Sequence, residues 1–109
     1  MLDLIQVVTT TEQKADAERI GRALVERRLA ACVQIGGPIE SFYWWKDQLE
    51  SADEWLCTIK TRHDLYAKVE SAIRKLHPYD EPEILAVPVI AASAGYIQWL
   101  NAQLIGGEE

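Results

Sequence analysis

The sequence predicts an α+β fold, a βαββαβ sandwich followed by one additional C-terminal helix. Short apolar, β-branched runs alternate with segments whose apolar residues recur at spacings of three and four. That order is the split βαβ arrangement of ferredoxin-like sandwiches. The length of 109 residues, with 49% hydrophobic and 26% charged residues, fits one globular domain, so we expect residues 1–109 to form a single domain.

The first strand is expected over residues 4–10, which read LIQVVTT. Thr10 and Gln13 have the spacing of a capping box, which predicts that a helix starts there. The apolar spacing continues this helix to about Arg28.

The second and third strands are expected to form a hairpin. Residues 31–35 begin the second strand, residues 36–38 (Gly-Gly-Pro) interrupt it as a bulge or kink, and residues 39–45 resume it. A polar turn over residues 46–48 then leads to the third strand over residues 54–61.

The second helix is predicted to be capped by Asp64 and to stop at His77, because the residue before a proline disfavours helix. A fourth strand is expected over residues 84–91 and a last helix over residues 94–104. Residues 105–109 read as a frayed tail.

Both faces of the predicted sheet are apolar. Phe42 and Trp44 alternate with Tyr43 and Trp45, so large aromatic side chains point both ways. Two helices can cover only one face, and a solvated face should instead show polar residues. We expect a partner subunit to cover the second face; the alternative is that the last helix covers it alone.

The two cysteines are predicted to be buried structural thiols. With the hairpin turn centred on residues 47–48, Cys32 would face His63 and Cys57 would face Pro38, an offset of roughly 20 Å. A disulfide needs Cα atoms within about 7 Å, so neither a bridge nor a shared metal is expected.

Charge and termini exclude several classes of function. The net charge of −6 argues against a nucleic-acid partner, which would need a basic patch. No apolar run is long enough to span a membrane, and no basic region precedes the first apolar run as in a signal peptide. The expected location is therefore the cytoplasm.

Five blocks of the sequence resemble the CutA divalent-cation-tolerance family. They are LVERRLAACV, SFYWW, IKT, HPYDEPEI and YIQWL, in that order over nearly the whole chain. The resemblance implies a ferredoxin-like subunit in a tight homotrimer and a link to copper, Cu(II), or another divalent cation. It also implies a likeness to trimeric signal proteins that bind small ligands between subunits. A metal-associated variant of the family carries a cysteine and a second histidine where this chain has Thr9 and Leu76, so a three-ligand copper site does not transfer intact.

His77 is the candidate metal ligand, since copper(II) favours imidazole, and Asp80, Glu81 and Glu83 are possible assistants. The alternative is structural: His77 ends a helix, where an imidazolium interacts favourably with the helix dipole. Pro78 and Pro82 would then fix the path of the chain into the last strand.

Tyr43, Trp45, Lys60, Tyr79 and Glu83 belong to the blocks that carry the resemblance and could line a cleft between subunits. In that cleft, Lys60 and Tyr79 would contact an anionic small molecule. The alternative is that the aromatic residues form interface core and that Lys60 and Glu83 form an ion pair between chains.

No catalytic motif is present: the sequence has no serine elbow and no glycine-rich phosphate loop. We therefore expect a binding protein rather than an enzyme. The first hypothesis is a trimeric cytoplasmic protein that binds divalent cations, copper above all, and contributes to metal tolerance. The second is a trimeric signalling or scaffold protein with a small-molecule or protein partner, in which metal binding is incidental.

Overall fold

The computed structural model describes residues 3–106 and confirms the α+β class, with four antiparallel strands and three helices in that range. The strands run in the order β2-β3-β1-β4 across one sheet. In chain order the elements are β1 (Leu4–Thr11), α1 (Lys14–Glu26), β2 (Cys32–Trp45), β3 (Gln48–Arg62), a 3₁₀ turn (His63–Leu65), α2 (Tyr66–Leu76), β4 (Leu85–Pro88) and α3 (Ala94–Gln103).

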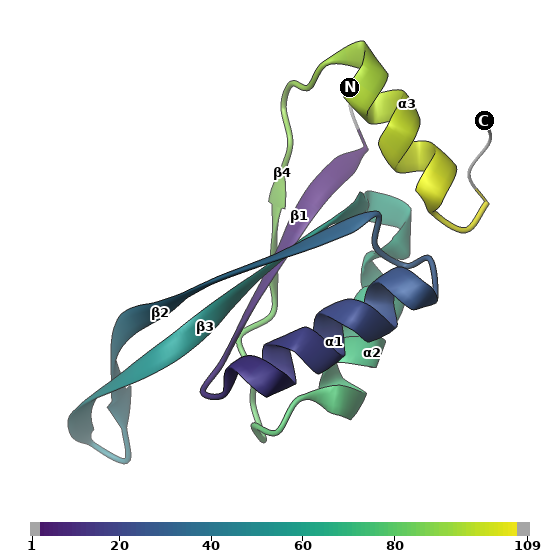
Figure 1. Ribbon diagram of the computed structural model, residues 1–109. Coiled ribbons are helices and arrows are strands. Elements are labelled where there is room, and N and C mark those ends of the chain that lie inside the picture. Colours follow the sequence, from purple (N-terminus) through teal and green to yellow (C-terminus); the bar gives the residue numbers. More distant parts are fainter. Residues whose placement is uncertain (1–2, 107–109) are drawn as a thin grey trace.

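The main core lies between one face of the sheet and the helices α1 and α2, which run side by side against it (Figure 1). Ile20 and Leu24 of α1 and Ile73 of α2 are fully buried against Val7 and Ile59 of the central strands. The spacing of three and four in both helices therefore marks their inward stripe, as the sequence predicts.

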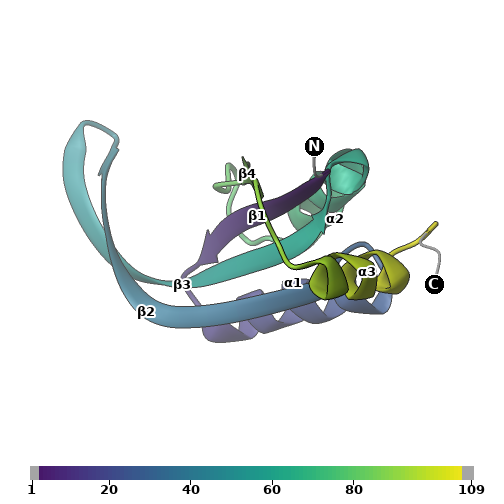
Figure 2. The ribbon, with the colours of Figure 1, turned by 90° about the horizontal axis from the view of Figure 1, so that it is seen from above.

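Beyond the end of β1, β2 and β3 continue as a two-stranded ribbon, the arm, over residues 39–54. The arm curves away from the rest of the molecule (Figures 1 and 2). With the arm included, the molecule measures 49 × 25 × 22 Å. The turn of the arm consists of Lys46 and Asp47, with φ values of 49° and 63° that are typical of a type I′ hairpin turn.

The face opposite α1 and α2, here called the open face, is covered only in part. Leu100 of α3 and Leu104, the C-cap residue of that helix, pack with Leu4. Leu85 and Val87 of β4 pair with β1 on this same face and are exposed. The last helix, the alternative cover considered from the sequence, therefore leaves part of the open face bare.

Both predicted helix caps are wrong. β1 extends to Thr11 because it pairs with β3 as far as Trp55, so α1 begins only at Lys14 with Gln13 as its N-cap residue. Gln13 makes no capping hydrogen bond with its side chain; instead, its carbonyl oxygen accepts one from the Thr11 hydroxyl over 2.8 Å. The capping box is absent because its first residue, Thr10, belongs to β1 and pairs with β3.

Asp64 does not cap α2. It lies in the 3₁₀ turn, and its carboxylate accepts a hydrogen bond from the Arg62 guanidinium at 2.9 Å. The N-cap residue of α2 is Leu65, and it makes no capping hydrogen bond with its side chain.

The other limits differ by a few residues. The third strand is longer than the predicted 54–61, because the arm keeps β3 paired to β2 from Gln48 onward. The fourth strand is shorter than the predicted 84–91, because the ladder between β4 and β1 runs only from Leu85 to Pro88 among the described residues. The first helix ends at Glu26, and Arg28 has a left-handed φ of 59°. Of the predicted tail over residues 105–109, the part over residues 107–109 lies outside the described residues.

Cys57 is fully buried, whereas Cys32 is only half-buried, so the expectation of two buried thiols holds for Cys57 alone. The register also differs from the expected one: Cys32 faces Lys60, and Cys57 faces Ile35. The two-residue turn and the irregularity between Gly36 and Ile39 cause this shift. Ile35, which faces Cys57, lies three positions along β2 from Cys32, or roughly 10 Å. The two thiols are therefore too far apart to bond, and both are free.

Candidate functional site

A cleft of about 810 Å³ lies between the arm and the loop that follows α2. Four aromatic side chains line it: Phe42, Tyr43, Trp45 and Tyr79. Six carboxylates also line it: Glu12, Glu50, Glu54, Asp80, Glu81 and Glu83.

His77 anchors the loop that forms one wall of the cleft. The helix α2 ends at Leu76, His77 is its C-cap residue, and His77 is only 8% exposed. Its Nε2 lies 2.8 Å from the carbonyl oxygen of Thr10, and its Nδ1 accepts a hydrogen bond from the Tyr79 backbone N–H over 3.1 Å. Both contacts are satisfied by a neutral ring that carries its proton on Nε2. His77 thereby ties the loop to the end of β1.

Tyr79 joins this loop to the base of the arm. Its ring meets His77 edge-on with centroids 4.6 Å apart, and its hydroxyl donates to Glu54 Oε2 over 2.9 Å. Burial raises the pKa of Tyr79, and Glu54, Glu12 and Tyr43 raise it further. The phenol therefore remains a protonated donor at neutral pH.

Two of the carboxylates of the cleft have partners. Glu54 is 9% exposed and accepts the hydrogen bond from Tyr79. Glu81 forms an ion pair with Arg74 of α2 at 3.2 Å. Within residues 3–106, the other four carboxylates form no ion pair, and no lysine or arginine lines the cleft.

Six of the residues singled out from the sequence line the cleft: Tyr43, Trp45, Tyr79, Asp80, Glu81 and Glu83. Lys60 does not join them. It lies on the open face beside α3, in a separate small pocket of about 190 Å³, and its ammonium is 5.7 Å from the Tyr96 ring centroid.

A single subunit does not fit a copper site. Both ring nitrogens of His77 are engaged in hydrogen bonds, so a metal would have to displace one of them. Across the described part of the chain, no three His, Cys, Asp or Glu side chains are placed to hold a metal ion. Thr9 is fully buried, and a neutral hydroxyl is a poor ligand for copper.

Sequence reasoning missed Glu12, Glu50 and Glu54. Glu12 follows β1, whereas Glu50 and Glu54 lie on the arm, so the three come from separate segments. No local motif marks them, because only the fold of the arm over the loop after α2 brings these segments together.

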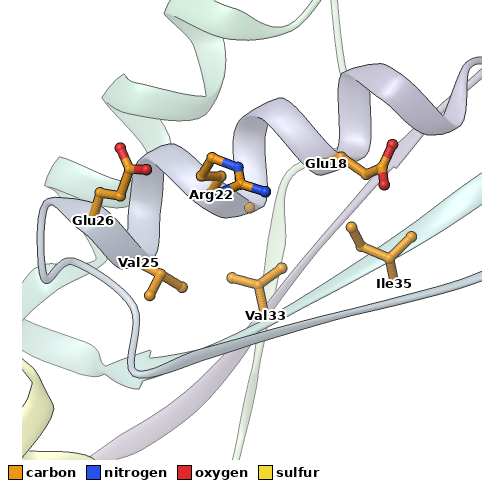
Figure 3. A pocket seen from close by; sticks show the side chains of 7 residues that line it. Glu18, Arg22, Val25, Glu26, Val33 and Ile35 are labelled. Carbon is orange, nitrogen blue, oxygen red and sulfur yellow. The ribbon is translucent and has the colours of Figure 1, made fainter.

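A shallower groove of about 390 Å³ runs between α1 and β2 (Figure 3). Val25, Val33 and Ile35 form its apolar part, while Glu18, Arg22 and Glu26 carry its charges. The groove therefore carries both positive and negative side chains, whereas the charged side chains of the cleft are all carboxylates. Separately, no helix among residues 3–106 is long and apolar enough to cross a membrane.

Comparison with known proteins places the chain among cation-tolerance proteins. A model of the family described as CutA1 divalent ion tolerance protein matches residues 5–103. The divalent-cation tolerance protein CutA of Archaeoglobus fulgidus is 36% identical over 95 residues, which cover 87% of this chain and 92% of that protein. Protein CutA of Homo sapiens is 41% identical over 86% of this chain, and the match spans about half, 52%, of the human protein's length.

Solved structures agree with this result. CutA from Xylella fastidiosa superposes with a TM-score of 0.91 at 33% identity, covering 94% of this chain and 98% of that one. CutA1 from Shewanella sp. SIB1 gives a TM-score of 0.91 at 36% identity, with coverages of 94% and 96%.

Proposed function

This chain belongs to the CutA1 divalent ion tolerance protein family, and we propose that it serves metal tolerance as a ferredoxin-like homotrimer that binds divalent cations, copper above all, in the cytoplasm. The family supports a metal-tolerance role, and the names of its members describe tolerance proteins rather than enzymes. We propose no catalysis.

The exposed aromatic arm carries the proposal of assembly. Phe42 is 68% exposed, Trp44 72%, Trp45 58% and Leu49 64%. Contiguous apolar surface of this kind marks interaction sites, and aromatic side chains are enriched in interfaces. The bare part of the open face adds Leu85 and Val87 to the surface that a second copy would cover.

The metal site of this proposal requires more than one subunit. Because residues 3–106 of one subunit do not place three ligands together, the copper ligands would come from neighbouring copies. His77 is the proposed imidazole ligand, and it would have to release Thr10 or Tyr79 to bind. Asp80, Glu81 and Glu83 would assist as carboxylates from the same loop.

The state of the cysteines supports the proposed cytoplasmic location. The two thiols are free and too far apart to pair, which suits a reducing compartment. Relatives differ in this respect: the Archaeoglobus fulgidus structure is described as periplasmic and the rice protein as chloroplastic.

Native mass spectrometry during a copper(II) titration tests the assembly and the metal together. We expect a trimer that takes up about one copper per subunit and saturates at low micromolar metal, a stoichiometry that one imidazole ligand per subunit would give. His77→Ala should abolish this uptake. His63→Ala, which replaces the other histidine, should not. Weak, unsaturable uptake by the wild type would contradict copper binding, and a monomer would contradict the trimer.

A second function is favoured by the cleft itself. Its volume and aromatic walls are typical of small-molecule sites, and both nitrogens of His77 are committed to holding one wall in place. The chain would then be a trimeric signalling or scaffold protein whose ligand binds in the cleft and for which metal binding is incidental. A molecule that co-purifies with the protein and is released on denaturation would support this function. Native spectra that show only the mass of the protein would count against it.

A further inference from the structure

A pocket of about 190 Å³ lies between the sheet and the last helix, on the part of the open face that α3 covers. Gln6 of β1 and Lys60 of β3 line it from the sheet, and Tyr96 and Leu100 line it from α3. Among the described residues, Lys60 is the only charged side chain in its lining. We propose that this pocket, here called the α3 pocket, binds a short-chain carboxylate, whose charge pairs with the ammonium of Lys60 and whose apolar tail packs against α3 and the loop before it.

Lys60 lacks an anionic partner in the described part of the chain. The residue is half-buried, yet within residues 3–106 its ammonium forms no ion pair. It makes a cation–π contact with Tyr96, but the distance of 5.7 Å to the ring centroid is close to the limit of about 6 Å for such contacts. A charged group withdrawn from water is usually paired with an opposite charge. A carboxylate in the α3 pocket would supply that charge.

The loop that joins β4 to α3 (Figure 1) lines one side of the α3 pocket and adds hydrogen-bond donors to it. The loop is fixed at its start, because the backbone N–H of Val89 donates to the carbonyl oxygen of Leu4 over 3.0 Å. The next lining residues, Ala91 and Ala92, donate from their N–H groups to no backbone carbonyl within residues 3–106. These N–H groups and the side-chain amide of Gln6 are donors for the two oxygens of a carboxylate.

The size and the apolar lining of the α3 pocket select a small ligand with a short tail. Sites for drug-sized molecules usually have volumes of about 300–1,000 Å³, so a pocket of about 190 Å³ takes a smaller molecule. A fully inorganic anion would pair with Lys60 but would leave the apolar lining without a partner. A short carboxylate such as butyrate satisfies both parts of the pocket. The apolar side chains of the lining are Leu4, Val89, Ala91, Ala92 and Leu100.

The α3 pocket is separate from the surfaces that the proposed functions use. None of its lining residues belongs to the arm or to the lining of the cleft. Leu85 and Val87, the residues of the open face that a second copy would cover, do not line it either. Its walls come from the sheet, the loop and α3 of one subunit. Carboxylate binding here is therefore independent of the trimer, of copper and of any ligand in the cleft.

Amide NMR shifts of the deuterated protein at pH 7.5, in a phosphate-free buffer, test the proposal with butyrate as the probe. Butyramide, which has no charge, and butylammonium, which has the opposite charge, are the matched ligands. We expect butyrate to shift the amides of residues 4–6, 89–92 and 96 saturably at roughly millimolar concentration, because its few atoms limit the affinity. Butyramide that binds as well, inorganic phosphate that displaces butyrate with equal affinity, or shifts centred on the cleft would each overturn the proposal.

Three variants locate the binding. Lys60→Met keeps the length of the side chain but removes its charge, and should weaken butyrate binding about tenfold or more. Lys68→Met makes the same change of net charge at an exposed position of α2 and should leave binding unchanged. Ala92→Leu keeps Lys60 but fills the pocket, and should abolish binding. Circular dichroism checks that each variant is folded. Folded Lys60→Met or Ala92→Leu protein that binds butyrate as the wild type does would overturn the proposal.

Discussion

The hydroxyl of Tyr79 donates a hydrogen bond to Oε2 of Glu54 over 2.9 Å, although 25 residues separate the two in the chain. Glu54 lies at the base of the arm, and Tyr79 lies in the loop that follows α2. This bond therefore fixes the arm relative to the helical layer. It also joins the two walls of the cleft, so the shape of the candidate site depends on one polar contact between a buried carboxylate and a protonated phenol.

Replacing Tyr79 with phenylalanine removes that donor and leaves the Glu54 carboxylate without a hydrogen bond from the described residues. We expect the free energy of unfolding to fall by about 1–3 kcal/mol, the usual cost of an unsatisfied buried group. Urea denaturation followed by circular dichroism measures it. Tyr96→Phe is the matched control, because the hydroxyl of Tyr96 makes no hydrogen bond within residues 3–106. Equal stability of the two variants would show that the bond to Glu54 contributes little.

Cys57 should make the protein less stable in alkali. Burial raises the pKa of its thiol from 9.0 to about 11, so the thiol of the unfolded chain loses its proton first. The unfolded state then binds fewer protons, and the stabilisation is complete below pH 9 and lost as the pH rises to about 11. A shift of this size corresponds to roughly 2–3 kcal/mol.

Unfolding free energies measured from pH 8 to pH 11 test this linkage. Cys57→Ala should be less stable at pH 8, because it leaves a cavity, but its stability should fall less steeply above pH 9. Cys32→Ala keeps the buried thiol and should retain the slope of the wild type. A Cys57→Ala variant with the wild-type slope would assign the alkaline loss to other groups, Tyr66 and Tyr79 first, since the pKa of each is also raised.

The order of the elements could be predicted from the sequence, because each helix and strand carries its own local period. Ile20 and Leu24, and likewise Val69 and Ile73, mark the buried stripes of α1 and α2 without reference to the rest of the chain. Element limits depend on partners that are distant in sequence. Thr10 reads as a helix cap, yet it lies in β1 opposite Leu56.

The candidate site could be predicted only in part for the same reason. Tyr43, Trp45, Tyr79 and Glu83 stand out as parts of recognisable blocks, and the structure brings them together. Glu54 has no such mark, because its burial results from the loop after α2 folding against the arm. Lys60 belongs to a recognisable block but points from the sheet towards α3. The ionic character of the cleft, acidic throughout, therefore follows from tertiary structure.

Gly37 should tolerate no side chain. Its φ of 144° is a conformation that residues with a Cβ rarely adopt, and a Cβ there would lie 3.0 Å from the carbonyl oxygen of Glu54. We expect Gly37→Ala to lower the free energy of unfolding by about 1–3 kcal/mol. Gly36→Ala is an adjacent control, since a Cβ there meets no atom within 4 Å. If urea denaturation gave the same midpoint for both variants, β2 would be accommodating a side chain at position 37 without strain.

Trp45 distinguishes the stability of the subunit from that of the proposed trimer. The side chain is 58% exposed in one subunit, so Trp45→Ala should leave the fold of the monomer nearly intact. If a second copy buries the ring, deleting it should weaken the assembly by about 3–5 kcal/mol, the cost of removing a buried aromatic side chain. Sedimentation velocity over a range of concentrations measures this loss, and circular dichroism checks the fold. Val25→Ala serves as the control, because Val25 is an exposed apolar residue on α1, away from the arm. A trimer that persists undiminished in Trp45→Ala would place this ring outside the interface, and Phe42 and Trp44 would then be the residues of the arm that hold the copies together.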